Sequence, residues 1–385
     1  MSRKRGAEIN LEEMVTGGQA SAYEALQLYR SRCNRLKVKS DFMQAISTAA
    51  KGVIALVSNG YENAGGELSA ILTNLLDQSG LDISPEIRNI VNEVDAAFGA
   101  VIPAAPATSG VVEIGPPKPP TSTISKTVVE TTPRVEYLKA LVVYSMKNGQ
   151  REYGDPMFHS TLGTCLWEYV AKGTNPNTPS PLNPRAFALY HRKSTYHFAV
   201  GEEPLALWSK ISEDYTPLVG QIGRPEEEVA LSREMERLVV IGMLQFLGLE
   251  NLRDANILHK QYVAFVKSKK STGKKSKKAA AADSPTAAAD TNESGFVDAE
   301  LMKFCDMLLQ TATRDAGPLF KVLVNAYSSH LNFDPVLPAL LMGPIGVKLF
   351  NVTAQNRQMG PPSGMPGMNP NMMAMMQQMM AGGQM

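Results

Sequence analysis

The apolar residues in the first hundred positions follow the spacing of helices. Ala22, Leu26, Tyr29, Cys33 and Leu36 are separated by steps of three and four, so they would lie on one face of a helix. The same steps recur in three later stretches, whose expected buried residues are Phe42, Ile46, Ala49, Val53 and Val57, then Leu68, Ile71 and Leu75, then Ile87, Ile90, Val94 and Phe98. The pattern therefore predicts four helices within residues 20–100.

Small and polar residues mark the ends of these helices. Asp41 can cap the second helix, and Asn59 with Gly60 can end it. Ser84 followed by Pro85 is a typical helix start. Short turns between such helices, without the alternation of a strand, favour antiparallel helix pairs. We therefore predict an all-α fold, an α-solenoid whose pairs recur at a tetratricopeptide-like period of roughly 34 to 40 residues.

The rest of the chain divides into helical stretches and segments without apolar periodicity. Further helices are expected at 134–147, 156–171, 184–199, 203–213 and 225–247, with a last helical block at 297–350. Residues 101–133 are rich in Pro, Thr and Ala, and residues 267–296 are rich in Lys and Ala, so both are predicted to be disordered insertions. The expected division is a flexible basic N-terminus (1–19), solenoid segments at 20–100, 134–266 and 297–352, the two insertions, and a Met-rich tail (353–385).

Composition narrows the class of protein. The chain has 385 residues, of which 44% are hydrophobic and 19% charged, and its formal net charge is +1. Because basic and acidic side chains nearly cancel, the molecule as a whole has no electrostatic attraction to nucleic acid. Cys33, Cys165 and Cys305 lie far apart and fit no disulfide framework, which is typical of a reducing compartment. With neither a secretory signal nor 18 consecutive apolar residues in view, we expect a cytosolic protein without a membrane span.

Motifs for catalysis or metal binding do not stand out. The five histidines are scattered and none lies four residues from another, whereas a helical metal site needs such spacing. In the stretch STGKKSKK, Lys275 occupies the position where a phosphate-binding loop requires a hydroxyl. The sequence contains neither GxSxG nor GxGxxG. We therefore expect no catalytic residues, no metal and no cofactor, and predict that the protein is not an enzyme.

Charge is informative only locally. Residues 1–40 carry eight basic and four acidic side chains. Arg32, Arg35 and Lys39 form a stripe outside the buried face of the first helix. Such a stripe is either a solvated face or a surface that orients an acidic protein partner. A nucleic-acid role for the seven lysines at 267–278 is the alternative, but lysine runs usually serve solubility or targeting.

Several segments, taken in order, resemble one known family. They are AYEALQLYRSRCNRL, GYENAGGELSAIL, SPEIRNIVNEV, PRVEYLKALVVYSMKNG, GDPMFHSTLGTCLW, AFALYHRKSTYHFAVGEE, MLQFLGLENLRDANILHKQY and the stretch from LLQTATRDAGPLF to GVKLFNV. Together they cover most of residues 20–352 and resemble the Golgi-to-ER traffic protein 4 family, the cytosolic adaptors in guided entry of tail-anchored proteins. The resemblance implies a helical solenoid that has no catalysis of its own.

The resemblance also implies two binding regions. In the N-terminal half, Arg30, Arg35 and Glu67 match positions that would face the tail-anchor-targeting ATPase, with surface solvation or capping as the alternative. In the C-terminal half, a ubiquitin-like partner would meet apolar surface at positions matching Tyr327, Ile345 and Phe350, for which core packing is the alternative. The lysine-rich insertion stands where the family has a hairpin that grips this partner.

Within GDPMFH, Asp155 is expected to cap a helix and His159 to pack or bond near it.

The methionine-rich tail is an addition to the family pattern. Six methionines lie between Met372 and Met380. On a helix, one face would carry Met372, Met375, Met376, Met379 and Met380. Such a face can accommodate apolar partners of differing shape, and the segment resembles the client-binding region of glutamine-rich co-chaperones. One hypothesis is a transient holder for hydrophobic transmembrane-segment clients. The alternatives are a low-complexity tail, a tail packed on the solenoid, or a stand-alone chaperone.

Overall fold

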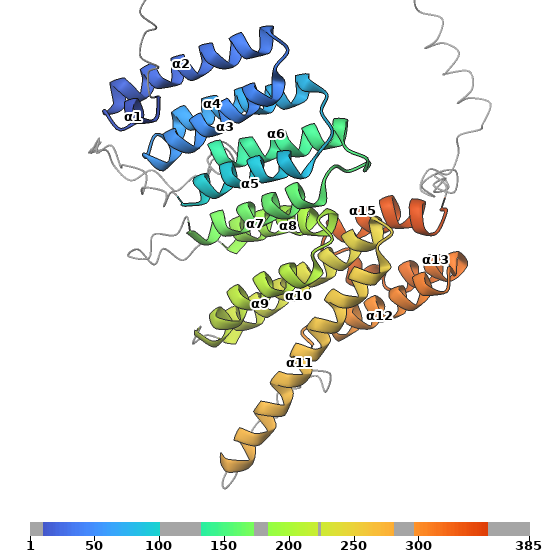
Figure 1. Ribbon diagram of the computed structural model, residues 1–385. Coiled ribbons are helices and arrows are strands. Elements are labelled where there is room, and N and C mark those ends of the chain that lie inside the picture. Colours follow the sequence, from blue (N-terminus) through green and yellow to red (C-terminus); the bar gives the residue numbers. More distant parts are fainter. Residues whose placement is uncertain (1–10, 101–131, 173–183, 222–224, 281–295, 353–385) are drawn as a thin grey trace, which may run out of the picture.

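The structure is an all-helical solenoid. The computed structural model describes residues 11–100, 132–172, 184–221, 225–280 and 296–352. Within these ranges every regular element is a helix. Successive helices run back and forth and stack along one axis, from α2 at one end to α12 and α13 at the other (Figure 1). This arrangement confirms the predicted all-α solenoid.

The helices fall close to the predicted ranges. Those of the N-terminal half are α1 (Leu11–Val15), α2 (Gln19–Val38), α3 (Phe42–Ser58), α4 (Glu62–Ser79), α5 (Pro85–Ala100), α6 (Pro133–Asn148) and α7 (Pro156–Lys172). Those of the C-terminal half are α8 (Pro184–Val200), α9 (Pro204–Gln221), α10 (Pro225–Gly248), α11 (Leu252–Ala280), α12 (Ala299–Thr313), α13 (Gly317–Ala326), α14 (Ser328–Leu331), α15 (Val336–Leu340) and the π-helical η1 (Leu341–Leu349).

Capping residues begin and end the helices as the sequence indicates. The Asp41 carboxylate accepts a hydrogen bond from the Gln44 backbone N–H (3.3 Å) at the start of α3. The Ser84 hydroxyl accepts one from the Ile87 N–H (3.2 Å) at the start of α5. Gly80 ends α4 with a φ of 59°, a left-handed conformation that glycine adopts without strain. Short turns therefore return the chain at each end of the stack.

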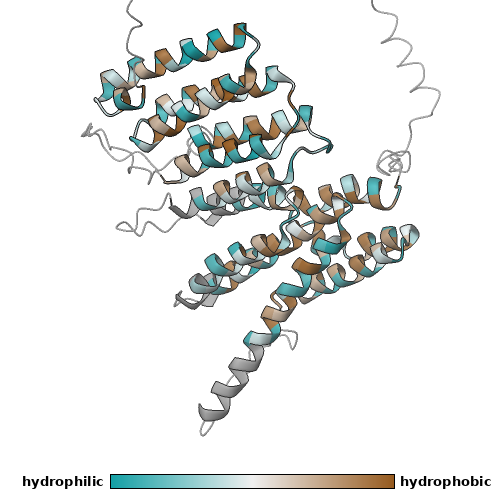
Figure 2. Cartoon of the chain, in the orientation of Figure 1, coloured by the Kyte–Doolittle hydropathy of each residue, from teal (hydrophilic) through white to brown (hydrophobic). Residues whose placement is uncertain are grey.

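Two apolar cores meet inside the stack. The first joins α1 to α7 and includes most of the predicted stripe residues, among them Leu26, Ile46, Leu68 and Phe98. The second joins the end of α7 to η1 and is centred on α10, whose residues from Leu238 to Leu247 contribute heavily to it. Hydrophobic residues accordingly lie on the helix faces that are turned toward each other (Figure 2). Because α7 contributes to both cores, it joins the two halves.

Gly65 allows α3 and α4 to pack unusually closely. A Cβ atom at this position would collide with Val57 Cγ2. Gly52, on the facing helix, would place a Cβ 2.6 Å from Leu68 Cδ2 and 2.8 Å from the Tyr29 ring. Because Cβ contacts this short essentially do not occur, a larger residue at either position would force its neighbours to shift.

Three boundaries differ from the sequence prediction. Residues 11–15 form α1, in which Val15 is fully buried, although residues 1–19 were expected to be flexible. Helix α9 continues through Pro217 to Gln221, beyond the expected end at 213. Helix α11 continues to Ala280, so residues 267–280 of the expected lysine-rich insertion are helical. Lysine and alanine are good helix formers, and a helix anchored by packed residues can extend through them. The expected insertion at 101–133 lies almost entirely outside the described residues. The remainder of the lysine-rich insertion, after Ala280, also lies mostly outside them.

Candidate docking surfaces

A groove between α2 and α4 brings together two of the predicted site residues. It has a volume of about 480 Å³. Leu26, Ile71 and Leu75 provide its apolar lining. Arg30 and Lys37 line it from α2, and Glu67 lines it from α4. We call this surface the α2–α4 groove.

The charged residues of the α2–α4 groove are available to a partner. Arg30, Lys37 and Glu67 are exposed and form no ion pair with any described residue. Elsewhere in the same half, several charges form ion pairs. Arg134 holds Asp95 through two hydrogen bonds of 2.8 and 2.9 Å, and Lys147 holds Asp77 at 3.0 Å. The groove therefore combines an apolar lining with charges of both signs that have no ion-pair partner among the described residues, a combination typical of docking surfaces.

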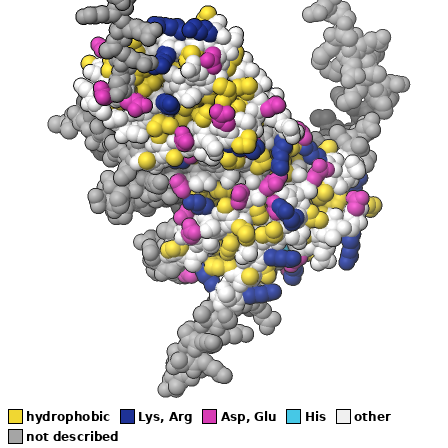
Figure 3. All heavy atoms as spheres, in the orientation of Figure 1, with side chains coloured by type: hydrophobic (Ala, Val, Ile, Leu, Met, Phe, Trp, Pro, Cys, Tyr) yellow, Lys and Arg dark blue, Asp and Glu magenta, His cyan; other side chains and the backbone are white. Residues whose placement is uncertain are grey.

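The structure separates Arg35 from Arg30. At 100° per residue, five positions turn a helix by about 140°. Arg30 therefore faces α4, whereas Arg35 lies on the opposite flank of α2 with Arg32 and Lys39. Arg35 donates a hydrogen bond to Ser31 Oγ (3.3 Å) within that helix. Lys and Arg side chains gather at the end of the molecule where α2 lies (Figure 3).

Exposed apolar residues of α2 were missed by the sequence analysis. Tyr23 and Val38 are 60% and 85% exposed, respectively. Both fall outside the buried stripe of α2, and this mismatch between residue type and position was the signal available in the sequence. Tyr23 and Val38 add exposed apolar area beside the charged residues of α2.

The predicted C-terminal site residues are mainly core residues. Ile345 is fully buried, and Phe350 is 6% exposed and stacks on Phe320 with ring centroids 4.3 Å apart. Tyr327 is partly buried and lies against Phe304 at 5.6 Å. In this conformation Ile345 and Phe350 have almost no surface to offer a partner. Their surroundings match the core packing that was the alternative for these positions.

Helix α13 offers apolar surface that the sequence analysis did not single out. Leu319 and Val322 are 49% and 63% exposed, while Phe320 and Leu323 on the inner face are buried. The sequence of α13, GPLFKVLVNA, is apolar on nearly every side, and a helix of that kind is usually covered on more than one side. Leu319 and Val322 thus form an apolar face that the described residues leave exposed, which we call the α13 face.

Histidines in the middle of the solenoid pack rather than react. His159 Nε2 donates to the Tyr153 carbonyl oxygen (2.8 Å). The neutral His159 ring therefore accepts at Nδ1, and His197 Nδ1 donates to it at 3.0 Å. Burial lowers the pKa of His159, and burial followed by the neighbouring His159 lowers the pKa of His197 to about 3. Asp155 caps α7 by accepting from the Met157 N–H (2.9 Å), as predicted, and pairs with Arg88 at 2.6 Å.

The described part of the chain contains neither a candidate metal cluster nor a candidate membrane-spanning helix. The described residues contain no group of three or more His, Cys, Asp or Glu side chains that could hold a metal ion. No helix in the described ranges is both long and apolar enough to cross a membrane. The tail residues Met372, Met375, Met376, Met379 and Met380 lie outside the described residues.

Comparison with known proteins finds relatives of most of the chain. A family model described as Golgi to ER traffic protein 4 matches residues 39–380. The Arabidopsis thaliana protein named Protein GET4 is 22% identical over 346 residues, which are 89% of each chain. The crystal structure of C. therm. Get4 has a similar fold, with a TM-score of 0.59, 19% identity, and coverage of 97% of this chain and 94% of the other. Arg30 and Arg35 precede the residues that the family model matches.

Proposed function

Because the chain belongs to the Golgi to ER traffic protein 4 family, whose members are adaptors in the guided entry of tail-anchored proteins, we propose that it bridges two specific partners in the cytosol. One is the tail-anchor-targeting ATPase, and the other is a ubiquitin-like adaptor. The bridge needs two separate surfaces on a rigid body. The solenoid has such surfaces near its two ends, the α2–α4 groove and the α13 face.

The α2–α4 groove is our candidate for ATPase docking. The observation that carries this assignment is the meeting, over an apolar lining, of Arg30 and Glu67, which form no ion pair with any described residue. Charges of both signs in one groove specify the orientation of a partner as well as its approach. Neither residue is required for the fold, since both are exposed.

The α13 face is our candidate for the ubiquitin-like partner. Leu319 and Val322 offer apolar area, whereas Ile345 and Phe350 support the same region from inside. Burial of exposed apolar side chains is the main source of affinity in such interfaces. We propose that Leu319 and Val322, rather than Ile345 and Phe350, contact the ubiquitin-like partner directly.

Charge reversal in the full-length protein tests the ATPase surface. We expect R30E to weaken binding of the same organism's tail-anchor-targeting ATPase by about tenfold, or ~1.4 kcal/mol, because one attractive contact becomes repulsive. The matched control is R35E, which makes the same change on the opposite flank of α2. Titration calorimetry at low and moderate salt would measure both variants.

Three outcomes distinguish the possible surfaces. If R30E weakens ATPase binding and R35E does not, the result supports docking of the ATPase at the α2–α4 groove. The reverse result assigns docking to the flank carrying Arg32, Arg35 and Lys39. Unchanged binding by both variants, or no binding by the parent protein in any nucleotide state, excludes ATPase docking through α2.

A further inference from the structure

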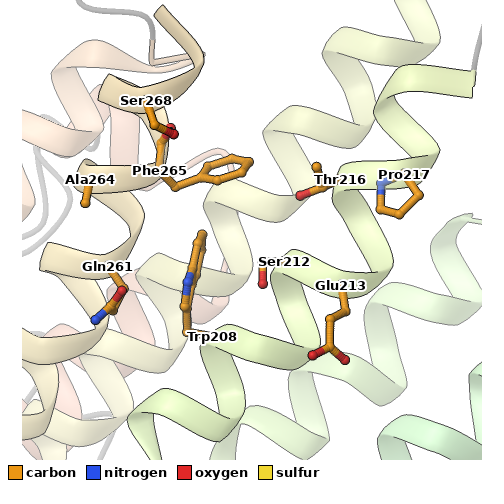
Figure 4. Close-up of a pocket in the computed structure, with 9 residues that line it drawn as sticks. All are labelled: Trp208, Ser212, Glu213, Thr216, Pro217, Gln261, Ala264, Phe265 and Ser268. Carbon is orange, nitrogen blue, oxygen red and sulfur yellow. The ribbon is translucent and has the colours of Figure 1, made fainter. Parts of the chain in front are cut away.

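A second groove, between α9 and α11, has no role in the proposed adaptor function. Its volume is about 750 Å³. It is lined from α9 by Trp208, Ser212, Glu213, Thr216 and Pro217, and from α11 by Gln261, Ala264, Phe265 and Ser268. The Phe265 ring reaches from α11 toward Thr216 and Pro217, and the Trp208 indole stands beside it (Figure 4). We call it the α9–α11 groove.

Aromatic rings form a rigid, partly exposed surface in the α9–α11 groove. The rings of Trp208 and Phe265 meet edge to face, with centroids 5.4 Å apart. Tyr262 supports Trp208 from the core at 6.1 Å, while Trp208 and Phe265 keep part of their surface open. Thr216 Oγ1 is shielded from solvent and has no hydrogen-bond partner in the described part of the chain. The groove thus suits an apolar segment that also brings polar groups.

The Met372–Met380 segment of the same chain has matching chemistry. Methionine side chains adapt to irregular surfaces, and their sulfur atoms make favourable contacts with aromatic rings. The segment MMAMMQQMM has no charged residue, and Gln377 and Gln378 carry amides that can pair with hydroxyl groups. As a helix its nine residues would be roughly 14 Å long. The α9 residues from Trp208 to Pro217 span about the same length.

The chain connection permits this contact. Gly248, at the end of α10, lies against Pro344 and Ile345 of the last helical element. Helix α11 begins a few residues later, and Phe265 lies roughly 20 Å along it. The 19 residues between Val352 and Met372 can reach about 60 Å when extended. The segment can therefore reach the groove within one molecule, where tethering makes even a weak contact effective.

We propose that Met372–Met380 docks into the α9–α11 groove of its own chain. The groove then covers an apolar segment that would otherwise face water, and a competing apolar peptide would release it. The segment is held rather than constantly available. This contact is separate from the α2–α4 groove and the α13 face, so it does not depend on the proposed bridging of partners.

Photo-crosslinking in the full-length protein tests the contact directly. A benzophenone amino acid replacing Ser212 is expected to crosslink to the peptide that contains Met372–Met380. The control places the same group at Val229 on α10, which is exposed and outside the groove, and it should give no such product. Replacing Met375, Met376, Met379 and Met380 by Ser should abolish the Ser212 product, while Ser at Met359, Met365 and Met368 should not.

Tryptophan fluorescence provides a second readout without a probe. The chain has two tryptophans. Trp167 is buried, and Trp208 lies in the groove. We expect the fourfold Met-to-Ser variant to shift the emission maximum to longer wavelength, because Trp208 would become more hydrated. The threefold linker variant should leave the maximum unchanged.

Opposite results would overturn the proposal. Absence of the Ser212 product together with an unchanged emission maximum would show that the groove is not occupied by this segment. Crosslinks that form only between two molecules, and that disappear on dilution, would exclude docking within one chain.

Discussion

At the scale of single residues, burial decides the protonation of the central histidines. The hydrogen bonds from His159 Nε2 to Tyr153 and from His197 Nδ1 to His159 require the His159 ring to be neutral, and burial lowers the pKa of His197 to about 3. His191 stacks on Trp167 with centroids 3.9 Å apart, and burial lowers its pKa to about 4. A proton on any of these rings must be accommodated away from water, which is costly. These residues therefore link stability to pH.

We expect the folded protein to lose stability as the pH falls below about 6.5. The pKa of His191 is lowered to about 4 and that of His197 to about 3 in the folded state. As the pH falls, these histidines bind protons in the unfolded chain at a higher pH than in the folded protein. Their contribution to the free energy of unfolding is therefore fully present above the unfolded pKa and declines as the pH falls toward the folded pKa values. Between pH 7 and pH 5, each buried histidine would cost on the order of 2 kcal/mol.

Urea unfolding at pH 7 and pH 5 measures this loss. The variant H197Q cannot bind the proton, so its stability should fall less between the two pH values than that of the parent protein. An equal loss in both proteins would show that His197 does not contribute.

At the scale of elements, glycines set the spacing between helices. Gly65 brings α4 against Val57 of α3, and on the same helix Glu67 and Ile71 line the groove with α2. The sequence GYENAGGELSAIL shows the glycines but not which neighbour each approaches. The α2–α4 groove is therefore coupled to a packing contact on the opposite side of α4.

We expect G65A to destabilise the fold by about 1–3 kcal/mol, because the added methyl group would overlap Val57. The change would be measured as a lower urea midpoint with an unchanged slope. N63A, an exposed position on the same helix, is the matched control and should be nearly neutral. If both variants behaved alike, close packing at Gly65 would not control the stability of this pair.

At the scale of the whole molecule, two cores support two separated surfaces. The first core lies beneath the α2–α4 groove, and the second lies beneath the α13 face. Only α7 contributes fully buried apolar residues to both cores within the described ranges. Changes on exposed residues at one end should therefore act independently of the other end.

This independence gives a prediction for the α13 face. The double variant L319D and V322D should abolish detectable binding of the ubiquitin-like adaptor, because charged groups would replace the apolar contact. Binding of the ATPase and the thermal midpoint should stay unchanged, since both residues are exposed. Calorimetric titration of each partner checks both parts. Retained adaptor binding would place that interface elsewhere.

The sequence by itself determined the class of fold and much of its outline. Steps of three and four depend only on the helix repeat, so the buried stripes of α2 to α5 could be predicted without a structure. The caps at Asp41 and Ser84 are also local, because each hydrogen bond spans three residues. Local periodicity did not place the end of α11, because helix extension depends on the packed residues that precede it.

Only the tertiary structure decided which exposed residues share a surface. Periodicity tells which face of α2 turns inward, but not which flank meets α4, so Arg30 joins Glu67 while Arg35 does not. Apolar character likewise cannot distinguish Ile345, which is buried, from Val322, which is exposed. Both distinctions depend on neighbouring helices that are distant in the sequence, and their positions follow from packing rather than from local pattern.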